Sequence, residues 1–282
     1  MANAEPDTLA RYDAGSEDRD TESTRLPLRR RPWFQRLLTW GALIIVWQVF
    51  AVVVGSYFWP SWQDVLRGFV TVLTTGGVEL VASSFLQMFV GFGLAIAVGV
   101  PIGLTIGSFR TVALVVEPYV NLLFVTSLAA VLPLLILLFG TGFTFRVAVV
   151  FLFAVFYVII NPANGVRSID PNLVDVSRSF GVGPVRRFFV LTAPATLPFT
   201  IAGVRLGLGQ AVQGMIIAEL WVTTGTGREL KALSQEHVLG QFFALAMVVV
   251  LVGTLLSQLL LWAQRLITPW AASTSGVGKG DG

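Results

Sequence analysis

The sequence of 282 residues contains no cysteine, and its one histidine is His237. These absences exclude a disulfide framework, a thiol nucleophile, a cysteine-ligated metal and a histidine-rich metal site. Charged residues are also scarce, at 12% against 55% hydrophobic residues, and the mean hydropathy is +0.77. A soluble domain carries about twice that charged fraction, so the composition indicates an integral membrane protein.

No motif in the chain predicts catalysis. No nucleophile lies in a pattern with a base, and the glycine-rich end GVGKGDG, with Lys279, lacks the GxxxxGK[ST] spacing of a phosphate-binding loop. We therefore expect no catalytic residue, no metal site, no bound cofactor and no ATP hydrolysis by this chain itself. The net charge of +3 does not indicate nucleic acid, because the arginines lie where membrane topology requires them.

Six apolar runs approach the roughly 20 residues that a helix needs to cross a bilayer. The fold class predicted is therefore an all-α integral membrane protein with about six transmembrane helices. The third run contains Pro118 and Pro133 and is too long for one straight span, so we read a span with a broken or re-entrant portion, kinked at Pro133. Two spans there would give seven in total. The runs are about 37–57, 81–107, 111–139, 145–162, 198–220 and 240–267.

The distribution of lysine and arginine predicts the orientation. With six spans, and counting from Arg25 onward, twelve basic residues fall in segments on one side and four in segments on the other. The richer side holds the cluster Arg29-Arg30-Arg31 and the polar segment 166–198, so both termini and this segment are expected in the cytoplasm. We expect residues 1–32 to form a disordered tail, 33–270 the membrane domain and 271–282 a flexible tail.

The polar segment 166–198 interrupts two long apolar runs and is expected to hold two short helices. The first, Asn172 to Phe180, follows Asp170-Pro171, an N-cap residue and a proline suited to the first helical position. Gly181 is expected to end it, since glycine readily adopts the left-handed conformation. The second helix should run from Pro184 to about Leu191, with Pro194 and Pro198 ending it and starting the next apolar run.

The first of these short helices carries an apolar stripe at Leu173, Val176 and Phe180, with spacings of three and four. Such a stripe needs a surface to pack on. It could lie on lipid headgroups or on its own helical bundle, or it could dock a soluble partner.

The segment resembles the cytoplasmic loop of permease subunits of bacterial ABC importers, in the binding-protein-dependent type I family. In that loop a Glu-Ala-Ala triplet is followed four residues later by glycine, and after nine further residues by Ile-x-Leu-Pro. Here Asp175-Val176-Ser177 occupies the triplet, Gly181 the glycine, and Leu191-Thr192-Ala193-Pro194 the closing tetrad. The later run from Ala202 to Gly209, with Ala218-Glu219-Leu220, resembles the branch that moves nitrate, sulfonates, taurine and related small molecules. The resemblance implies a solute of the nitrate, sulfonate or taurine type or a vitamin precursor.

The resemblance implies a permease subunit in the plasma membrane, a set of partner proteins and a role for the loop. Two cytoplasmic ATPase subunits would bind ATP and magnesium, an extracytoplasmic binding protein would deliver the solute, and two copies of this chain would form one pathway as a homodimer. The residues implied in coupling to the ATPase are Leu173, Asp175, Val176, Ser177, Arg178, Phe180, Gly181, Arg186 and Pro194.

Polar residues within the apolar runs are candidates for the pathway, because intramembrane polar groups are costly and usually face a cavity or a bundle interior. Arg205 either contacts an anion or pairs with internal carboxylates or carbonyls, and we favour the structural role. The candidates are Gln48, Gln87, Arg205, Gln210, Gln213 and Glu219.

Glycines at four-residue spacing, such as Gly99, Gly103 and Gly107 or Gly203 and Gly207, predict close helix packing, within the chain or between two copies. The segment 61–75 could form an interfacial helix, and the segment 221–239 is interpreted as a solvated loop because of its mixed charges. Both segments could also meet an extracytoplasmic partner. Two other functions stay open. One is a transporter driven by an ion gradient, which would need more intramembrane carboxylates for ion coupling than this chain has. The other is a non-transporting scaffold that recruits a soluble protein.

Overall fold

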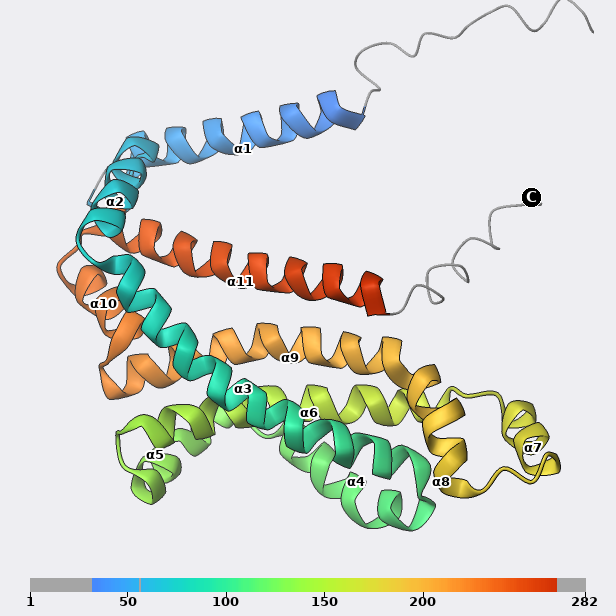
Figure 1. The fold of residues 1–282 in the computed structure, drawn as a ribbon. Coiled ribbons are helices and arrows are strands. Elements are labelled where there is room, and N and C mark those ends of the chain that lie inside the picture. The colour runs from blue at the N-terminus through green and yellow to red at the C-terminus, as the bar shows by residue number, and fades with distance from the viewer. Residues whose placement is uncertain (1–31, 56, 268–282) are drawn as a thin grey trace, which may run out of the picture. The chain divides into compact units, whose positions relative to one another are not determined.

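The computed structural model describes residues 32–55 and 57–267, and every regular element in them is a helix. The elements are α1 (Pro32–Val54), α2 (Trp62–Thr74), α3 (Gly77–Ser108), α4 (Arg110–Val125), α5 (Leu128–Phe139), α6 (Phe143–Arg167), α7 (Pro171–Ser179), α8 (Pro184–Arg187), the π-helical segment η3 (Phe188–Thr192), α9 (Ala193–Val222), α10 (Gly225–Gln235) and α11 (Leu239–Ile267) (Figure 1). The predicted tails at 1–32 and 271–282 lie outside the described residues, apart from Pro32 itself.

Four helical stretches in the described part of the chain are long and apolar enough to cross a membrane: 77–108, 143–167, 184–222 and 239–266. The pair α4 and α5 makes a fifth if it is counted as one span. These five coincide with five of the six predicted runs. The first predicted run corresponds to α1, whose apolar portion Leu38–Val54 is shorter than the others.

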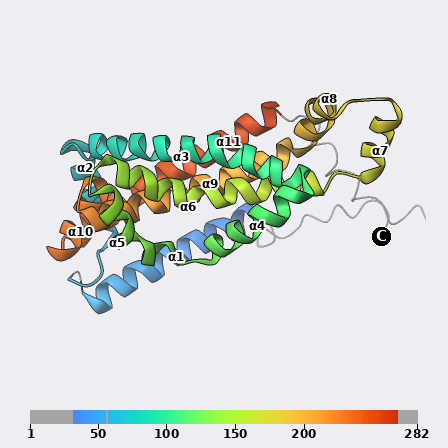
Figure 2. The same ribbon diagram turned by 90° about the horizontal axis from the view of Figure 1, so that it is seen from below.

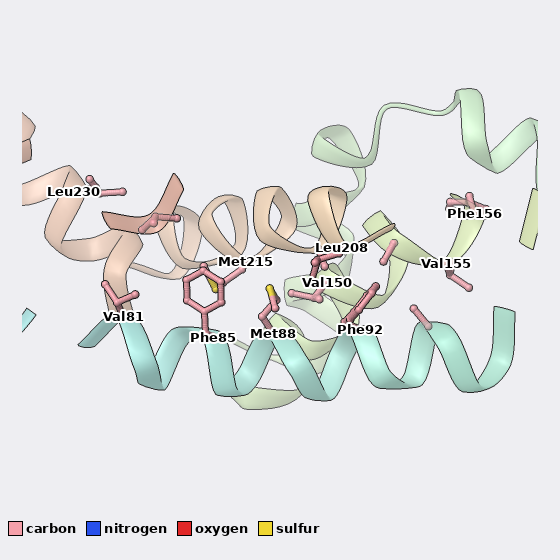
Figure 3. Close-up of a cluster of buried hydrophobic side chains, with 14 of the residues drawn as sticks. Val81, Phe85, Met88, Phe92, Val150, Val155, Phe156, Leu208, Met215 and Leu230 are labelled. Carbon is pink, nitrogen blue, oxygen red and sulfur yellow. The ribbon is translucent and has the colours of Figure 1, made fainter. Parts of the chain in front are cut away.

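The bundle that begins at Trp62 is centred on α3, α6 and α9. Their buried faces meet in one apolar cluster, to which α3 contributes Phe85, Met88 and Phe92, and α9 contributes Leu208 and Met215 (Figure 3). The inward-facing residues of α3 recur at spacings of three and four, which is the period of one helical face. Because α6 lies between partners on both sides, it is the most buried of the spans.

Glycines bring the backbones of these three helices into contact. A Cβ atom added at Gly203 of α9 would lie 2.6 Å from Cβ of Asn161 and 2.9 Å from the carbonyl oxygen of Tyr157, both on α6. Gly103 of α3 lies directly against the carbonyl of Ile159 on α6. The glycine spacing therefore serves packing within the chain, which was one of the two interpretations left open by the sequence.

The predicted break within the third apolar run is confirmed, but it does not lie at a proline. The helices α4 and α5 are bent by 101°. Pro118 and Pro133 both lie inside helices, while the chain turns at Thr126 and Ser127, which have extended backbone conformations. The two extended residues interrupt the hydrogen-bond ladder more completely than one missing proline N–H does.

The segment Met1–Ser61 is a separate compact unit, of which α1 and residues 57–61 are described. Within it, the indole N–H of Trp47 donates a hydrogen bond of 3.1 Å to the carbonyl of Pro60, and the rings of Trp47 and Trp59 lie 4.7 Å apart. These contacts fold the end of α1 onto the turn that follows it.

Besides α7 and α8, two helices lie outside the predicted spans. The helix predicted at 61–75 is present as α2. The segment 221–239 was wrongly predicted as a solvated loop, because it forms α10, whose Thr226, Gly227, Leu230 and Leu233 are buried. Polar sequence there conceals a helix with one apolar face. In both views α10 and α2 lie at one end of the bundle, here called the α10 end, and α7 and α8 lie at the other, the α7 end (Figures 1 and 2).

Candidate functional site

The helix α7 begins with a hydrogen-bonded cap that its sequence predicts. The carboxylate of Asp170 accepts a hydrogen bond of 2.9 Å from the backbone N–H of Asn172, and Pro171 occupies the first helical turn. The cap satisfies one of the N–H groups that a helix start leaves unpaired, and the proline has no N–H to satisfy. A nine-residue helix is thus stabilised locally at its start.

The end of α7 is a Schellman motif centred on Gly181. The backbone N–H of Val182 donates to the carbonyl of Ser177 at 3.1 Å, and that of Gly181 donates to the carbonyl of Arg178 at 2.8 Å. Gly181 has φ of 72°, the left-handed conformation that this motif requires. The predicted glycine stop is confirmed, and it sets the angle at which the chain leaves α7.

The apolar stripe of α7 is left uncovered by the described chain. Leu173 and Val176 are each 52% exposed and Phe180 is 81% exposed, while no residue of α7 is buried. Figures 1 and 2 show α7 standing off from the end of the bundle, connected by non-helical segments. The stripe therefore packs on neither α6 nor α9, which removes one of the three interpretations of the sequence.

Polar residues border this stripe. Arg178 donates to the carboxylate of Asp175 at 3.2 Å, and both side chains are largely exposed. The hydroxyl of Ser177 donates to the carbonyl of Val174 at 2.6 Å, so it faces its own helix. Arg186 is exposed on α8. Of the residues predicted to couple to an ATPase, all except Arg186 and Pro194 lie together on α7 and its C-terminal turn.

The prediction that Pro194 and Pro198 end a short helix is wrong. The helix that starts at Pro184 continues through η3 into α9, and both prolines lie within it. The N–H of Ala193 donates to the carbonyl of Phe188, one residue further back than in an α-helix. This wider turn accommodates the ring and the missing N–H of Pro194. Figure 1 shows α8 departing from the line of α9 here.

An ion pair that the sequence analysis did not identify joins α4 to the base of the α7 segment. Arg167, the last residue of α6, donates to both carboxylate oxygens of Glu117, at 2.9 and 2.6 Å. Two parallel hydrogen bonds fix the relative orientation of the groups. Since α7 begins four residues after Arg167, the pair holds the root of the loop against α4.

A buried polar cluster lies at the α10 end and contains two predicted pathway residues, Glu219 and Gln87. Glu219 is 1% exposed, and its Oε2 accepts a hydrogen bond of 2.9 Å from the N–H of Gly227. The hydroxyls of Ser84 and Thr226 lie 2.9 Å apart, which ties α3 to α10. Neither Ser84 nor Thr226 was singled out from the sequence, because isolated hydroxyl residues carry no pattern.

This cluster fixes α10 against α9. Gly225 and Gly227 lie so close to Glu219 that a Cβ at Gly227 would be 2.6 Å from Cβ of Glu219. The connecting turn includes Thr223 with φ of 53°, an uncommon conformation for a β-branched residue. Such a conformation persists only where the contacts of the surrounding residues hold it in place. Glu219 therefore anchors α10 and is covered by it.

The other predicted pathway residues lie elsewhere. Arg205 and Gln213 are exposed on α9, and Gln210 is half-buried. Nε of Arg205 donates to the hydroxyl of Ser257 on α11 at 3.2 Å. Gln48 is half-buried on α1, in the separate first unit. The five candidates in the bundle that begins at Trp62 thus form no single site there.

Comparison with known proteins gives one family and several relatives. Residues 99–273 match the family described as the binding-protein-dependent transport system inner membrane component. Over 218 residues the chain is 29% identical to a probable ABC transporter permease protein of Brucella melitensis, covering 77% of this chain and 89% of that protein. It is 28% identical to the putative aliphatic sulfonates transport permease of Bacillus subtilis (88% and 91% covered) and 26% to the taurine transport system permease of Escherichia coli (87% and 92%).

Proposed function

Because the chain belongs to the family of binding-protein-dependent transport system inner membrane components, and is an ABC transporter permease of the nitrate/sulfonate/taurine type, we propose that it is the membrane-spanning subunit of an ATP-driven importer. In this proposal separate ATPase subunits bind ATP and magnesium and hydrolyse the nucleotide. The α7 segment couples their movement to the spans.

The observation that carries the proposal is the exposed apolar stripe on an independently capped helix. No residue of this nine-residue helix is buried by the described chain, so its two caps, more than the bundle, maintain it as a docking surface. Full burial of an exposed phenylalanine or leucine side chain contributes about 1.5–3 kcal/mol. Seating Leu173, Val176 and Phe180 in a groove of a partner would therefore provide substantial binding energy, and the Asp175–Arg178 pair at the rim would orient the contact.

The remaining partners follow from the same proposal. An extracytoplasmic binding protein delivers the solute, two copies of the chain form one pathway, and both termini lie in the cytoplasm. The solute is a small oxyanion or sulfonate, because relatives are named for aliphatic sulfonates and taurine. The cytoplasmic placement of α7 is supported by the basic residues Arg178, Arg186 and Arg187 around it.

The test is a pull-down and ATPase assay with the ATPase encoded nearest to this gene. Phe180→Asp removes the most exposed side chain of the stripe and should weaken binding about 30-fold, corresponding to about 2 kcal/mol. Leu66→Asp, a substitution of an exposed apolar residue on α2 at the α10 end, serves as the matched control and should bind like the wild type.

Two results would refute the proposal. One is that the wild-type chain co-purifies with no ATPase. The other is that Phe180→Asp binds and stimulates hydrolysis as well as Leu66→Asp does. Binding without solute uptake in proteoliposomes that also contain the binding protein would favour the scaffold function, and uptake driven by an ion gradient without ATP would favour a secondary transporter.

A further inference from the structure

One face of α9 combines exposure with polarity inside a predicted span. Its exposed residues recur at spacings of three and four, which places them on one side of the helix. The opposite side packs against α6 through Gly203, Gly207 and Gly214. The exposed face consists of Ala202, Arg205, Leu206, Gly209 and Gln213.

Arg205 lies deep within the span. The 12 residues from Ala193 to Arg205 rise about 18 Å along α9, and the 17 residues from Arg205 to Val222 rise about 25 Å. Its hydrogen-bond partner Ser257 lies on α11, about 12 Å along the axis from Arg265 near the end of that helix. If α9 crosses a hydrocarbon core about 30 Å thick, these distances place the backbone of Arg205 inside that core.

The charge of Arg205 is not compensated by the described chain. None of the three ion pairs among the described residues includes it, and its only hydrogen bond there is the one from Nε to Ser257. The carboxylate on the same helix, Glu219, is about 21 Å away along the axis and is buried under α10. Four N–H donors of the guanidinium group are thus left for a partner outside this set.

A lipid-facing arginine at this depth would be costly, and such residues usually face a bundle interior or a water-filled cavity. We propose that the Arg205 face, meaning Arg205, Gly209 and Gln213, lines the transport pathway and that Arg205 binds the solute, a small oxyanion such as a sulfonate, nitrate or carboxylate. The planar guanidinium group matches two oxygens of such an anion. Ser257 fixes Nε, and the missing side chain of Gly209 leaves room beside it.

This inference rests on the proposed transport function, but it can be tested separately by water access and charge. The chain contains no cysteine, so a single introduced thiol is unique. Gly209→Cys is suitable because no atom lies within 4 Å of an added Cβ there. The full-length variant in proteoliposomes is treated with the anionic reagent sulfonatoethyl methanethiosulfonate and with its cationic trimethylammonioethyl counterpart. Leu86→Cys on α3 is the control for an exposed apolar position.

The Gly209→Cys variant should react with both reagents, with a ratio of anionic to cationic rates above that of a free thiol in solution, while the Leu86→Cys variant should react with neither. Adding Arg205→Gln should lower the ratio of anionic to cationic rates about tenfold. The charge of Arg205 lies roughly 6 Å from residue 209, one helical turn along α9. In a water-like dielectric it attracts the anionic reagent and repels the cationic one, and the two effects together change the rate ratio about tenfold. Arg205→Lys should restore the ratio, since it keeps the charge.

Three results would overturn the inference. The first is a Gly209→Cys variant as unreactive as the Leu86→Cys variant. The second is a rate ratio that Arg205→Gln leaves unchanged. The third is a Gly209→Cys variant that is closed to both reagents and forms a disulfide between two copies, since the face would then be a protein contact. Binding of the ATPase to the wild-type chain in the same membranes reports on the proposed function independently.

Discussion

Replacing Gly181 by alanine tests whether the turn after α7 depends on a left-handed residue. With φ of 72° and no atom within 4 Å of an added Cβ, the substitution meets no steric obstacle except its own backbone. The left-handed conformation costs a residue with a Cβ about 1–2 kcal/mol. Part of that cost is offset by about 0.4–1 kcal/mol, because alanine has fewer conformations to lose when the loop forms. The net expectation is a loss of about 1 kcal/mol.

Gly183→Ala is the matched control in the same loop. Gly183 has φ of −62° and ψ of 157°, a conformation open to any residue, and an added Cβ there also meets nothing within 4 Å. Alanine at this position should leave the turn unchanged or slightly stabilise it. The two glycines thus differ in backbone conformation and not in available space.

The assay is hydrogen exchange at the Val182 amide in nanodiscs, because this N–H closes the Schellman motif on the carbonyl of Ser177. A loss of about 1 kcal/mol should lower its protection factor about fivefold in Gly181→Ala. Gly181→Asn should fall in between, since asparagine tolerates the left-handed region better than alanine. Equal protection in Gly181→Ala and Gly183→Ala would refute the assignment of Gly181 as the cap.

Three further predictions concern the other contacts. Asp170→Ala should destabilise the start of α7 by about 1 kcal/mol, visible as faster exchange of the Asn172 amide, whose bond it removes; unchanged exchange would contradict the cap. Arg167→Glu should lower the melting temperature, because it removes the hydrogen bonds to Glu117 and costs about 1 kcal/mol of folding free energy. The double variant Glu117→Arg/Arg167→Glu restores opposite charges and should recover most of that loss. A double variant as unstable as the single one would argue against the pair. Glu219→Ala should cost about 2–4 kcal/mol, because it leaves the buried Gly227 N–H unpaired and opens a cavity. Glu219→Gln keeps an acceptor and should cost clearly less in the same thermal measurement, whereas equal losses would contradict the anchoring role.

The elements that the sequence predicted correctly are those with local causes. The caps at Asp170 and Gly181 depend on residues within one helical turn, so side-chain chemistry alone was sufficient to place them. The spans follow from apolar length, and the break between α4 and α5 from the excess of length over one crossing. The glycine spacing correctly indicated close packing, but it did not specify that the packing partner is α6 of the same chain.

The predictions that failed required knowledge of distant partners. The helix through Pro194 continues because a π-type turn precedes it, and no residue type specifies such a turn. The helix α10 was missed because it has few apolar positions, including Leu230 and Leu233. These residues are buried only because α10 packs against α9 and α11, which the sequence does not show. Arg205 and Glu219 were both candidates for the pathway, yet α10 covers Glu219 and leaves Arg205 exposed.

The positions where the bundle can bend follow from where its backbones touch. Along α3, α6 and α9, glycine contacts such as those at Gly103 and Gly203 fix the helices against one another, and close-packed interfaces resist continuous deformation. Two interruptions lie outside these contacts: the π-turn at 188–192 and the break at Thr126–Ser127. A force applied to α7 therefore reaches α9 through the π-turn, and reaches α4 through the Glu117–Arg167 pair. If the coupling proposal is right, breaking that pair should reduce solute uptake more than it reduces ATPase binding, since the docking stripe itself remains intact.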